Sequence, residues 1–445
     1  MIARPLPIRA AALAACLLIL LVAAPAEAYV GPGAGFAFVT SFFLLLTTLL
    51  LALLALVSWP IRLLVGLVRR KRPTLPRRVK RVVVVGLDGI DPKTVRRLVD
   101  AGELPNFKRL IDLGGISALG TACPPLSPVA WSNFATGVDP SRHGVFDFLV
   151  RDRRTYGVKL SSTDIRPPRR SFRLGGAQLP LGKPRARLLQ RSVPFWQILG
   201  RYGVRSSVLR VPITFPPRSF AGTMLSAMCV PDLLGTQGSF AYYTDEQAEA
   251  ERIGGKVIGV RVDQGRVTTT LKGPPHPLRR DGQPMTLPLS IELRPDKQSV
   301  AIQVGDQQTV ARLGEYTDWV TVSFRLLPGI KLRGICRFRL NSVDPFRLYV
   351  TPVNIDPGNP SLAISHPFSF SVFLSKLIGR YATLGFAEDT WALNENVIDK
   401  DAFWQQVQLC QQEREQMFFE MVKRLRRGVC ICVFDGTDRV QHMYM

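Results

Sequence analysis

Two apolar segments far apart in the sequence are each followed by acidic residues. Residues 81–87 and 429–434 are rich in β-branched residues and lack polar alternation, as is typical of parallel strands buried on both faces of a sheet. The first segment leads directly into Asp88, and the second leads through a turn to Asp438 and His442. The carboxyl ends of parallel strands open into the crevice where α/β proteins bind ligands. The two segments therefore predict a sheet edge that carries hard metal ligands.

The remainder of the pattern predicts an α/β, doubly wound fold with an inserted antiparallel β module. Helical patterns cover 92–101, 105–113, 196–202, 370–383 and 401–427, and a further strand covers 204–211. In the last helix a single arginine, Arg414, interrupts the apolar stripe. Residues 151–192 are rich in Arg and Pro, which indicates a surface excursion. Within the module, strands are expected at 257–262, 266–271, 287–293, 299–304, 319–326, 334–340 and 347–350.

These patterns divide the chain into five segments. The first is a signal-like hydrophobic segment, and the second combines a transmembrane helix with a basic juxtamembrane stretch. The α/β domain follows in two parts that flank the β-rich module, and its second part is expected to be truncated. The boundaries are 1–28, 29–80, 81–255, 256–352 and 353–445.

The N-terminal region predicts attachment to the inner membrane. Arg4 and Arg9 precede an apolar run that ends near an Ala-Glu-Ala site, as in a signal peptide. A second apolar run, about residues 36–57, is long enough to cross a bilayer, and nine basic residues follow between 62 and 81. Basic residues flank the cytoplasmic ends of membrane spans, so we expect the remaining chain to face the cytoplasm. The alternative is a single uncleaved anchor with an extracytoplasmic domain.

The charge of the chain limits its partners. The 58 basic and 34 acidic residues give a formal net charge of +24, which suits an anionic partner. No RNA-binding aromatic motif, zinc finger or helix-turn-helix pattern is present, so the sequence predicts a membrane surface rather than nucleic acid. The seven cysteines are scattered, which argues against a disulfide framework.

Ser127 is a candidate phosphate-binding or nucleophilic residue. With Pro128 after it, Ser127 is expected to be the N-cap of a helix that ends at Gly137. Unpaired N–H groups and the positive end of the helix dipole favour phosphate there. A divalent metal on the hydroxyl would make it a nucleophile. The alternative is an ordinary N-cap.

The other candidates also have structural alternatives. Asp88 can be a turn-capping residue, because Gly86 and Gly89 allow a tight turn around it. Asp438 and His442 are four positions apart, which places them on one helical turn and resembles a metal chelate. The same spacing is common on solvated helices.

Taken in order, these motifs resemble the alkaline phosphatase superfamily, and within it the type I phosphodiesterase/nucleotide pyrophosphatase branch. The likeness covers roughly residues 81–250 and 353–445 and is closest to membrane-anchored bacterial members. The ordered set is specific, although no single motif is. The matching segments are Gly86 to Gly89, Leu104 to Phe107, Ser127 to Gly137, Pro140 to Gly144, Val211 to Thr214 and Asp435 to His442.

The resemblance implies an alkaline-phosphatase-like fold and a two-metal phosphohydrolase, more a phosphodiesterase than a monoesterase. Ser127 would attack phosphorus. Asp88 and Ser127 would serve one divalent metal, and Asp438 and His442 the other; the metals are usually zinc, with manganese as the alternative. The substrate would be a phosphorylated small molecule or a lipid-linked phosphate.

Some features depart from the family pattern. The family pattern continues with an Asp-His-Gly segment and a later His, which complete both metal sites, and no Asp-His-Gly occurs in the chain. Phe148 stands where nucleotide pyrophosphatases tend to carry Asn. Ser127 replaces the more frequent Thr, while His143 is expected to be structural. The segment from Cys123 to Ser127 lacks the arginine of a sulfatase box. Two alternatives to the enzyme therefore remain: a non-catalytic binding module of the same fold, or a fragment whose last strand forms an exposed apolar edge.

Overall fold

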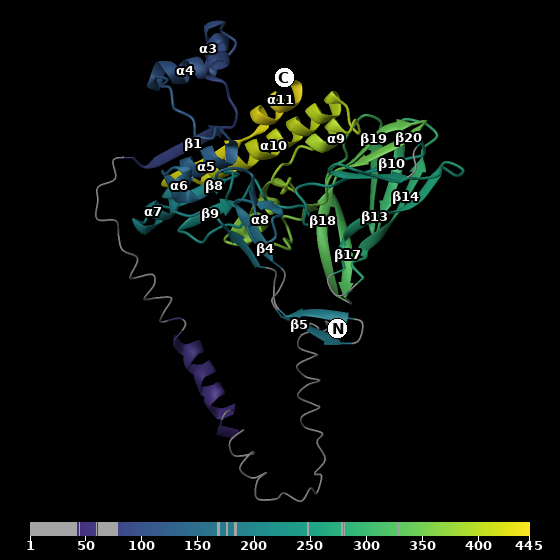
Figure 1. The fold of residues 1–445 in the computed structure, drawn as a ribbon, viewed down its shortest axis with the longest axis horizontal. Coiled ribbons are helices and arrows are strands. Elements are labelled where there is room, and N and C mark those ends of the chain that lie inside the picture. The colour runs from purple at the N-terminus through teal and green to yellow at the C-terminus, as the bar shows by residue number, and fades with distance from the viewer. Residues whose placement is uncertain are drawn as a thin grey trace, which may run out of the picture. The chain divides into compact units, whose positions relative to one another are not determined.

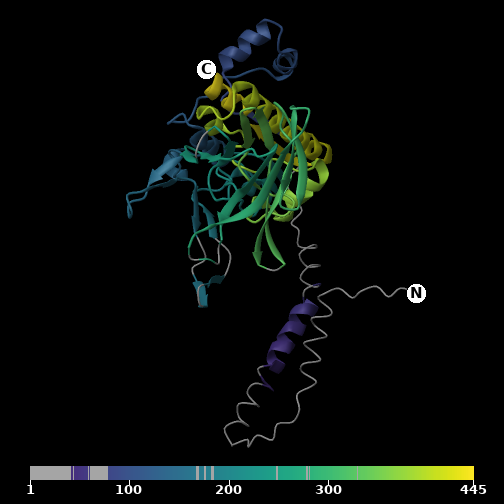
Figure 2. The same ribbon diagram turned by 90° about the vertical axis from the view of Figure 1, so that its right-hand side faces the viewer.

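The computed structural model describes residues 42–43, 45–58, 60, 79–166, 170–174, 177–181, 185–246, 249–276, 279, 281–327 and 329–445 (Figures 1 and 2). The chain divides into two compact units, Met1–Arg72 and Pro73–Met445. In the first unit, the described residues between 42 and 60 are all helical. No helix in the described part of the chain is both long and apolar enough to span a bilayer. The predicted signal-like segment, the start of the predicted span and the basic residues up to Arg78 lie outside the described residues.

The second unit is built on a five-stranded sheet with the order β1-β23-β8-β9-β22. The first four strands are mutually parallel, and β22 runs antiparallel to β9. Because β1 and β23 pair in register over seven residues, their carboxyl ends lie together. The predicted α/β class is confirmed. The strands are β1 (Arg81–Leu87), β23 (Gly428–Phe434), β8 (Ser206–Leu209), β9 (Gly222–Leu225) and β22 (Ser365–His366).

Helices pack on both faces of this sheet, as in a doubly wound fold. On one face, α5 (Ser127–Thr136) and α7 (Phe195–Arg201) place Trp131 and Trp196 against β8 and β23. On the other face, α8 (Ser369–Ile378) and α10 (Lys400–Arg424) pack Leu374 and Met417 against the same strands. The lack of polar alternation in β1 and β23 reflects these two apolar layers.

The fragment alternative expected the last strand, β23, to form an exposed edge of the sheet, and this expectation is wrong. Every residue of β23 is buried, because β23 lies between β1 and β8 in the interior of the sheet. The edge strand beside β23 is β1, whose Val82, Val83 and Val85 are 43–49% exposed. The two helices after it, α3 (Pro92–Asp100) and α4 (Pro105–Gly114), contribute little to the core, since α4 buries none of its residues.

Three further sheets form the β module. Their orders are β11-β12-β10-β20-β19, β13-β14-β15-β16 and β17-β18-β21, and a large apolar core joins them. The module is not wholly antiparallel, because β10 pairs in parallel with β12. The strand predicted at 334–340 is two strands, β18 and β19, separated at Arg337. The bounds are β10 (Phe240–Thr244), β11 (Ala250–Arg252), β12 (Gly255–Gly259), β13 (Arg266–Pro275), β14 (Pro284–Leu293), β15 (Ser299–Val304), β16 (Gln307–Arg312), β17 (Val320–Leu327), β18 (Ile330–Cys336), β19 (Phe338–Val343), β20 (Phe346–Val350) and β21 (Asn354–Ile355).

The Arg- and Pro-rich excursion contains short paired strands, which its composition did not indicate. It comprises three antiparallel pairs, β2-β3, β4-β7 and β5-β6. These strands are β2 (Leu149–Arg151), β3 (Val158–Leu160), β4 (Thr163–Arg166), β5 (Arg170–Leu174), β6 (Ala177–Leu181) and β7 (Arg185–Leu188). The remaining helices are α6 (Pro140–His143), α9 (Thr390–Asn394) and α11 (Gly436–Tyr444).

Candidate active site

Asp88 lies at the carboxyl end of β1 and is 6% exposed. One carboxylate oxygen, Oδ1, accepts hydrogen bonds from Trp131 Nε1 at 2.9 Å and Ser127 Oγ at 3.2 Å. The other, Oδ2, is buried and has no hydrogen-bond partner among the described residues. Burial raises the pKa of Asp88, hydrogen bonding from Trp131 partly offsets this, and the nearby Asp438 raises the pKa further. A buried carboxylate oxygen without a donor is costly unless a ligand satisfies it.

Ser127 is the first residue of α5 rather than its N-cap. Leu126 is the N-cap and accepts the N–H groups of Val129 and Ala130, while the Ser127 hydroxyl makes no cap bond. The predicted start of the helix is thus displaced by one residue, and the hydroxyl is available to Asp88. Gly137 ends the helix as expected, with φ of 66°.

Asp438 and His442 lie one turn apart on α11, directly after β23. The distance between Asp438 Oδ1 and His442 Nε2 is 3.4 Å. The Asp438 side chain is 13% exposed, whereas that of His442 is 70% exposed. The structure thus brings Ser127 and Asp438 close to Asp88, because β1 and β23 are neighbours, whereas the contact of His442 within this set is with Asp438.

Two polar residues that the sequence did not single out attach α11 to the end of β1. Thr437 Oγ1 donates to the Asp88 backbone carbonyl at 2.5 Å, and Gln441 Nε2 donates to the Gly89 carbonyl at 2.7 Å. Asp88 N–H in turn donates to the Phe434 carbonyl at 2.9 Å. Three hydrogen bonds across this junction hold the two acidic segments in place. In the sequence, the available sign of this attachment was that Thr437 and Gln441 are four positions apart, and so lie on one face of a helix.

A glycine allows this close approach. Gly89 has φ of +69°, and a Cβ atom there would lie 2.9 Å from Asp438 Cα. Gly89→Ala therefore combines left-handed backbone strain with a backbone clash that displaces α11. For the phosphodiesterase activity that the sequence resemblance implies, we expect Gly89→Ala to cause at least a tenfold loss, about 1.4 kcal/mol of transition-state stabilisation. The measurement is kcat/KM at saturating metal.

Gly102→Ala is the matched control for this substitution. Gly102 has φ of +78°, but a Cβ atom there would meet nothing within 4 Å. The control therefore carries the same kind of strain without the contact to Asp438, and we expect it to keep its activity. Equal losses in the two variants would show that the approach of Asp438 to Gly89 is unimportant.

His143 has a structural role in the fold, as expected. Its Nδ1 accepts the Val145 N–H at 3.1 Å, and its Nε2 lies 2.7 Å from Asn133 Oδ1. The side chain is buried, and burial lowers the pKa of His143. With both ring nitrogens in protein hydrogen bonds, the imidazole stays neutral and joins α5 to the loop after α6.

The arginine that interrupts the stripe of α10 supports the same edge of the sheet. Arg414 is 3% exposed, forms an ion pair with Asp435, and lies 3.8 Å from Glu388. Asp435 directly follows β23 and precedes α11. In the sequence, the available sign of this ion pair was the position of Arg414 within the apolar stripe of α10. Arg414 thus holds the turn from which Asp438 and His442 project.

The donor set suits divalent cations only in part. The Ser127 hydroxyl contacts Asp88, the His442 imidazole contacts Asp438, and Asp88 Oδ2 has no hydrogen-bond partner among the described residues. Oxygen and imidazole donors are suited to zinc or manganese. Among the described residues, however, no group of three or more His, Cys, Asp or Glu side chains is arranged to hold a metal ion.

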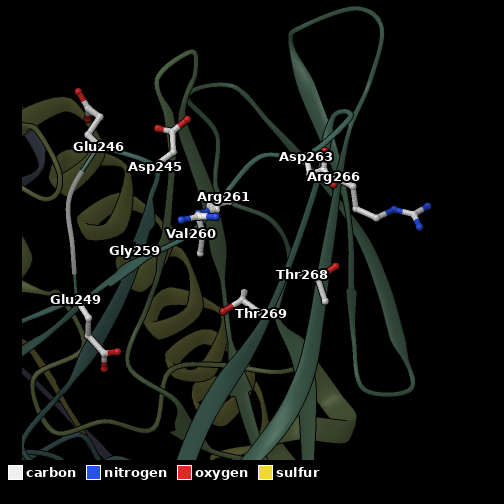
Figure 3. Close-up of a pocket in the computed structure, with 10 residues that line it drawn as sticks. All are labelled: Asp245, Glu246, Glu249, Gly259, Val260, Arg261, Asp263, Arg266, Thr268 and Thr269. Atoms are coloured by element: carbon white, nitrogen blue, oxygen red, sulfur yellow. The ribbon is translucent and has the colours of Figure 1, made fainter.

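One hollow in the β module is separate from this site. It has a volume of about 820 Å³ and is lined by residues between Asp245 and Thr269 (Figure 3). Two of its carboxylates form ion pairs, Glu246 with Arg347 at 2.6 Å and Glu249 with Lys272 at 2.7 Å. Figure 3 shows Arg266 extending away from the other labelled side chains. The hollow contains none of the predicted site residues.

A parallel sheet that collects a hydroxyl, carboxylates and an imidazole at the ends of its strands is typical of a hydrolase. Residues 82–268 match the family model described as type I phosphodiesterase / nucleotide pyrophosphatase. This part of the chain is therefore a domain of that family, as the sequence resemblance indicated, and the family is one of phosphohydrolases. The match includes Asp88 and Ser127 but stops before Asp438 and His442. No curated protein and no solved structure matches the chain significantly.

Proposed function

We propose that this protein is a metal-dependent phosphodiesterase in which Ser127 is the nucleophile. The observation that carries the proposal is the contact of Ser127 Oγ with Asp88 Oδ1, 3.2 Å long, beside an unpartnered Asp88 Oδ2. Because Ser127 Oγ donates its proton in this bond, its lone pairs stay available to attack phosphorus. The family generally depends on divalent metals and acts on phosphorylated small molecules such as nucleotides.

The proposed reaction is a displacement at phosphorus. An Oγ–P bond forms, the bond to the leaving oxygen breaks, and that oxygen departs with the bonding electron pair. The hydroxyl proton passes to Asp88 Oδ1, which already accepts it in a hydrogen bond. Water then attacks phosphorus and the Oγ–P bond breaks, its electron pair passing to Oγ. Oγ takes back the proton held by Asp88, and the attacking water loses one proton to solvent as the phosphate product leaves.

Asp88 and Ser127 would hold one divalent ion, and Asp438 and His442 the other. Bound metals of this kind stabilise negative charge on the attacking and leaving oxygens. The chain's own contribution is to position these donors, through the bonds of Thr437, Gln441 and Arg414 described above. Zinc is the first candidate and manganese the second, because both accept mixed oxygen and imidazole donors.

The test is hydrolysis of bis-p-nitrophenyl phosphate compared with p-nitrophenyl phosphate, each with added zinc, added manganese or a chelator. We expect faster release of p-nitrophenol from the diester, and loss of this activity with the chelator. Release from neither compound under any metal condition would contradict the proposal.

A second candidate is a non-catalytic binding module of the same fold. The absence of a complete metal-binding group among the described residues favours it. Metal content separates the two candidates. Less than one tightly bound divalent ion per chain, measured by elemental analysis after gel filtration, would favour the binding module.

A further inference from the structure

A basic groove lies in the β module, away from the residues of the candidate active site. It has a volume of about 800 Å³ and is bounded by β14, the turn between β15 and β16, the β17-β18 hairpin and Arg380. Five basic side chains line it, against a single carboxylate, that of Asp306. The basic members are Arg279, Arg325, Lys331, Arg333 and Arg380.

The pairing of the hairpin places like charges directly opposite each other. Arg325 on β17 faces Lys331 on β18, and Ser323 faces Arg333 one pair further along. Because side chains alternate along a strand, all three cations project from the same face, opposite the buried Val322 and Phe324. Like charges directly across a strand pair destabilise a sheet. Stability of the fold therefore does not explain why Arg325 and Lys331 are paired.

Of the three cations on this face of the β17-β18 hairpin, one lies near a carboxylate. Lys331 Nζ lies 3.4 Å from Asp306 Oδ2. In the described part of the chain, no carboxylate lies within ion-pairing distance of Arg325 or Arg333. Two guanidinium groups that face a shared hollow suit the bidentate oxygens of a phosphate group.

A hydroxyl on the same face also lacks a partner. Thr321 Oγ1 is buried and makes no hydrogen bond to any described residue. Thr321 is two and four positions from Ser323 and Arg325 on β17, and all three line the groove. An unsatisfied hydroxyl beside unpaired guanidinium groups indicates a missing acceptor, as an anionic ligand would supply.

We propose that this groove binds a diphosphate or phosphate-ester group, held by Arg325 and Arg333 with Thr321 as a further donor. The site is independent of the proposed catalytic residues, none of which lines the groove. The ligand's phosphate can come from a soluble diphosphate or from the headgroup of an anionic phospholipid. This gives the β module a recognition role beside the hydrolytic domain.

The test uses the full chain carrying Ser127→Ala, so that no probe is hydrolysed. Binding of inorganic pyrophosphate is measured by calorimetry, and binding of phosphatidylglycerol-containing vesicles by co-sedimentation against phosphatidylcholine vesicles. We expect Arg325→Gln/Arg333→Gln to weaken binding of at least one probe by about tenfold or more, since two charge-assisted contacts are lost. Loss for pyrophosphate identifies a soluble ligand, and loss for vesicles alone identifies a lipid headgroup.

The control is Arg294→Gln/Arg312→Gln, which removes the same charge from the same module. Arg294 and Arg312 lie outside the groove, and Arg312 is 3.8 Å from Glu315. We expect this pair to bind both probes as the parent does. If the two double variants bind alike, or if the parent binds neither probe, the proposal is wrong.

A stability measurement separates ligand binding from a structural role. In the absence of any anion, Arg325→Gln should raise or maintain the urea concentration at the midpoint of unfolding, because it relieves the repulsion with Lys331. A lower midpoint would show that Arg325 serves the fold, and would count against the proposal.

Discussion

Replacing Ser127 with alanine should reduce diester hydrolysis by roughly a thousandfold or more, as the loss of a nucleophile does in other hydrolases. The hydroxyl is the only reacting group that the substitution removes. The first turn of α5 should persist, because Leu126 and not Ser127 caps the helix. The measurement is kcat for bis-p-nitrophenyl phosphate with the preferred metal. Unchanged thermal unfolding would show that the loss is chemical.

Two variants control this result. Ser127→Thr keeps a hydroxyl at the same position and should retain most of the activity. Ser132→Ala removes a hydroxyl from the same helix, one that donates to the Pro128 carbonyl at 2.7 Å and does not reach Asp88. It should change stability slightly and kcat little. Activity in Ser127→Ala equal to that of Ser132→Ala would rule out Ser127 as the nucleophile.

Asp88→Asn should separate activity from stability. Asparagine retains an acceptor for Ser127 and Trp131 but removes the negative charge, so we expect at least a hundredfold loss of metal-dependent activity, about 2.7 kcal/mol. In the metal-free protein the same change should raise the free energy of unfolding at neutral pH by roughly 1 kcal/mol. It removes a buried charge and its repulsion with Asp438.

The pH dependence of stability tests whether burial of the Asp88 charge is the cause of the gain in Asp88→Asn. Burial raises the pKa of Asp88 above its value in the unfolded chain. A carboxyl group of this kind contributes stability that is fully present below its unfolded pKa of about 3.9 and is lost as the pH rises through its folded pKa. The stability gained by Asp88→Asn should therefore be larger at about pH 8 than at about pH 5. Urea unfolding with a chelator measures it, and a gain that shrinks with rising pH would contradict this account.

Added metal should make the parent chain more stable than Asp88→Asn, the reverse of the order expected without metal. A divalent ion that binds only the folded state stabilises it according to its concentration and affinity. Zinc or manganese should therefore raise the unfolding midpoint of the parent chain more than that of Asp88→Asn. Equal shifts in the two proteins would place the metal away from Asp88.

The sequence alone was sufficient for features that depend on local chemistry. Uninterrupted β-branched runs identified β1 and β23, and Ser-Pro with a later glycine placed α5 to within one residue. The spacing of Asp438 and His442 placed them on one helical turn, because that periodicity is a property of the helix itself. The interruption at Arg414 was visible in the sequence, but its burial and its ion pair with Asp435 were found only in the structure.

Only the tertiary structure decided the relations between distant segments. No local signal shows that β23 inserts between β1 and β8, so the expectation that it would form the sheet edge was wrong. That insertion brings Asp438 to Gly89 and so assembles the candidate site. Strand register likewise sets Arg325 opposite Lys331, which residue order alone does not reveal. Local patterns determine each element, whereas strand order and register depend on packing summed over the whole core.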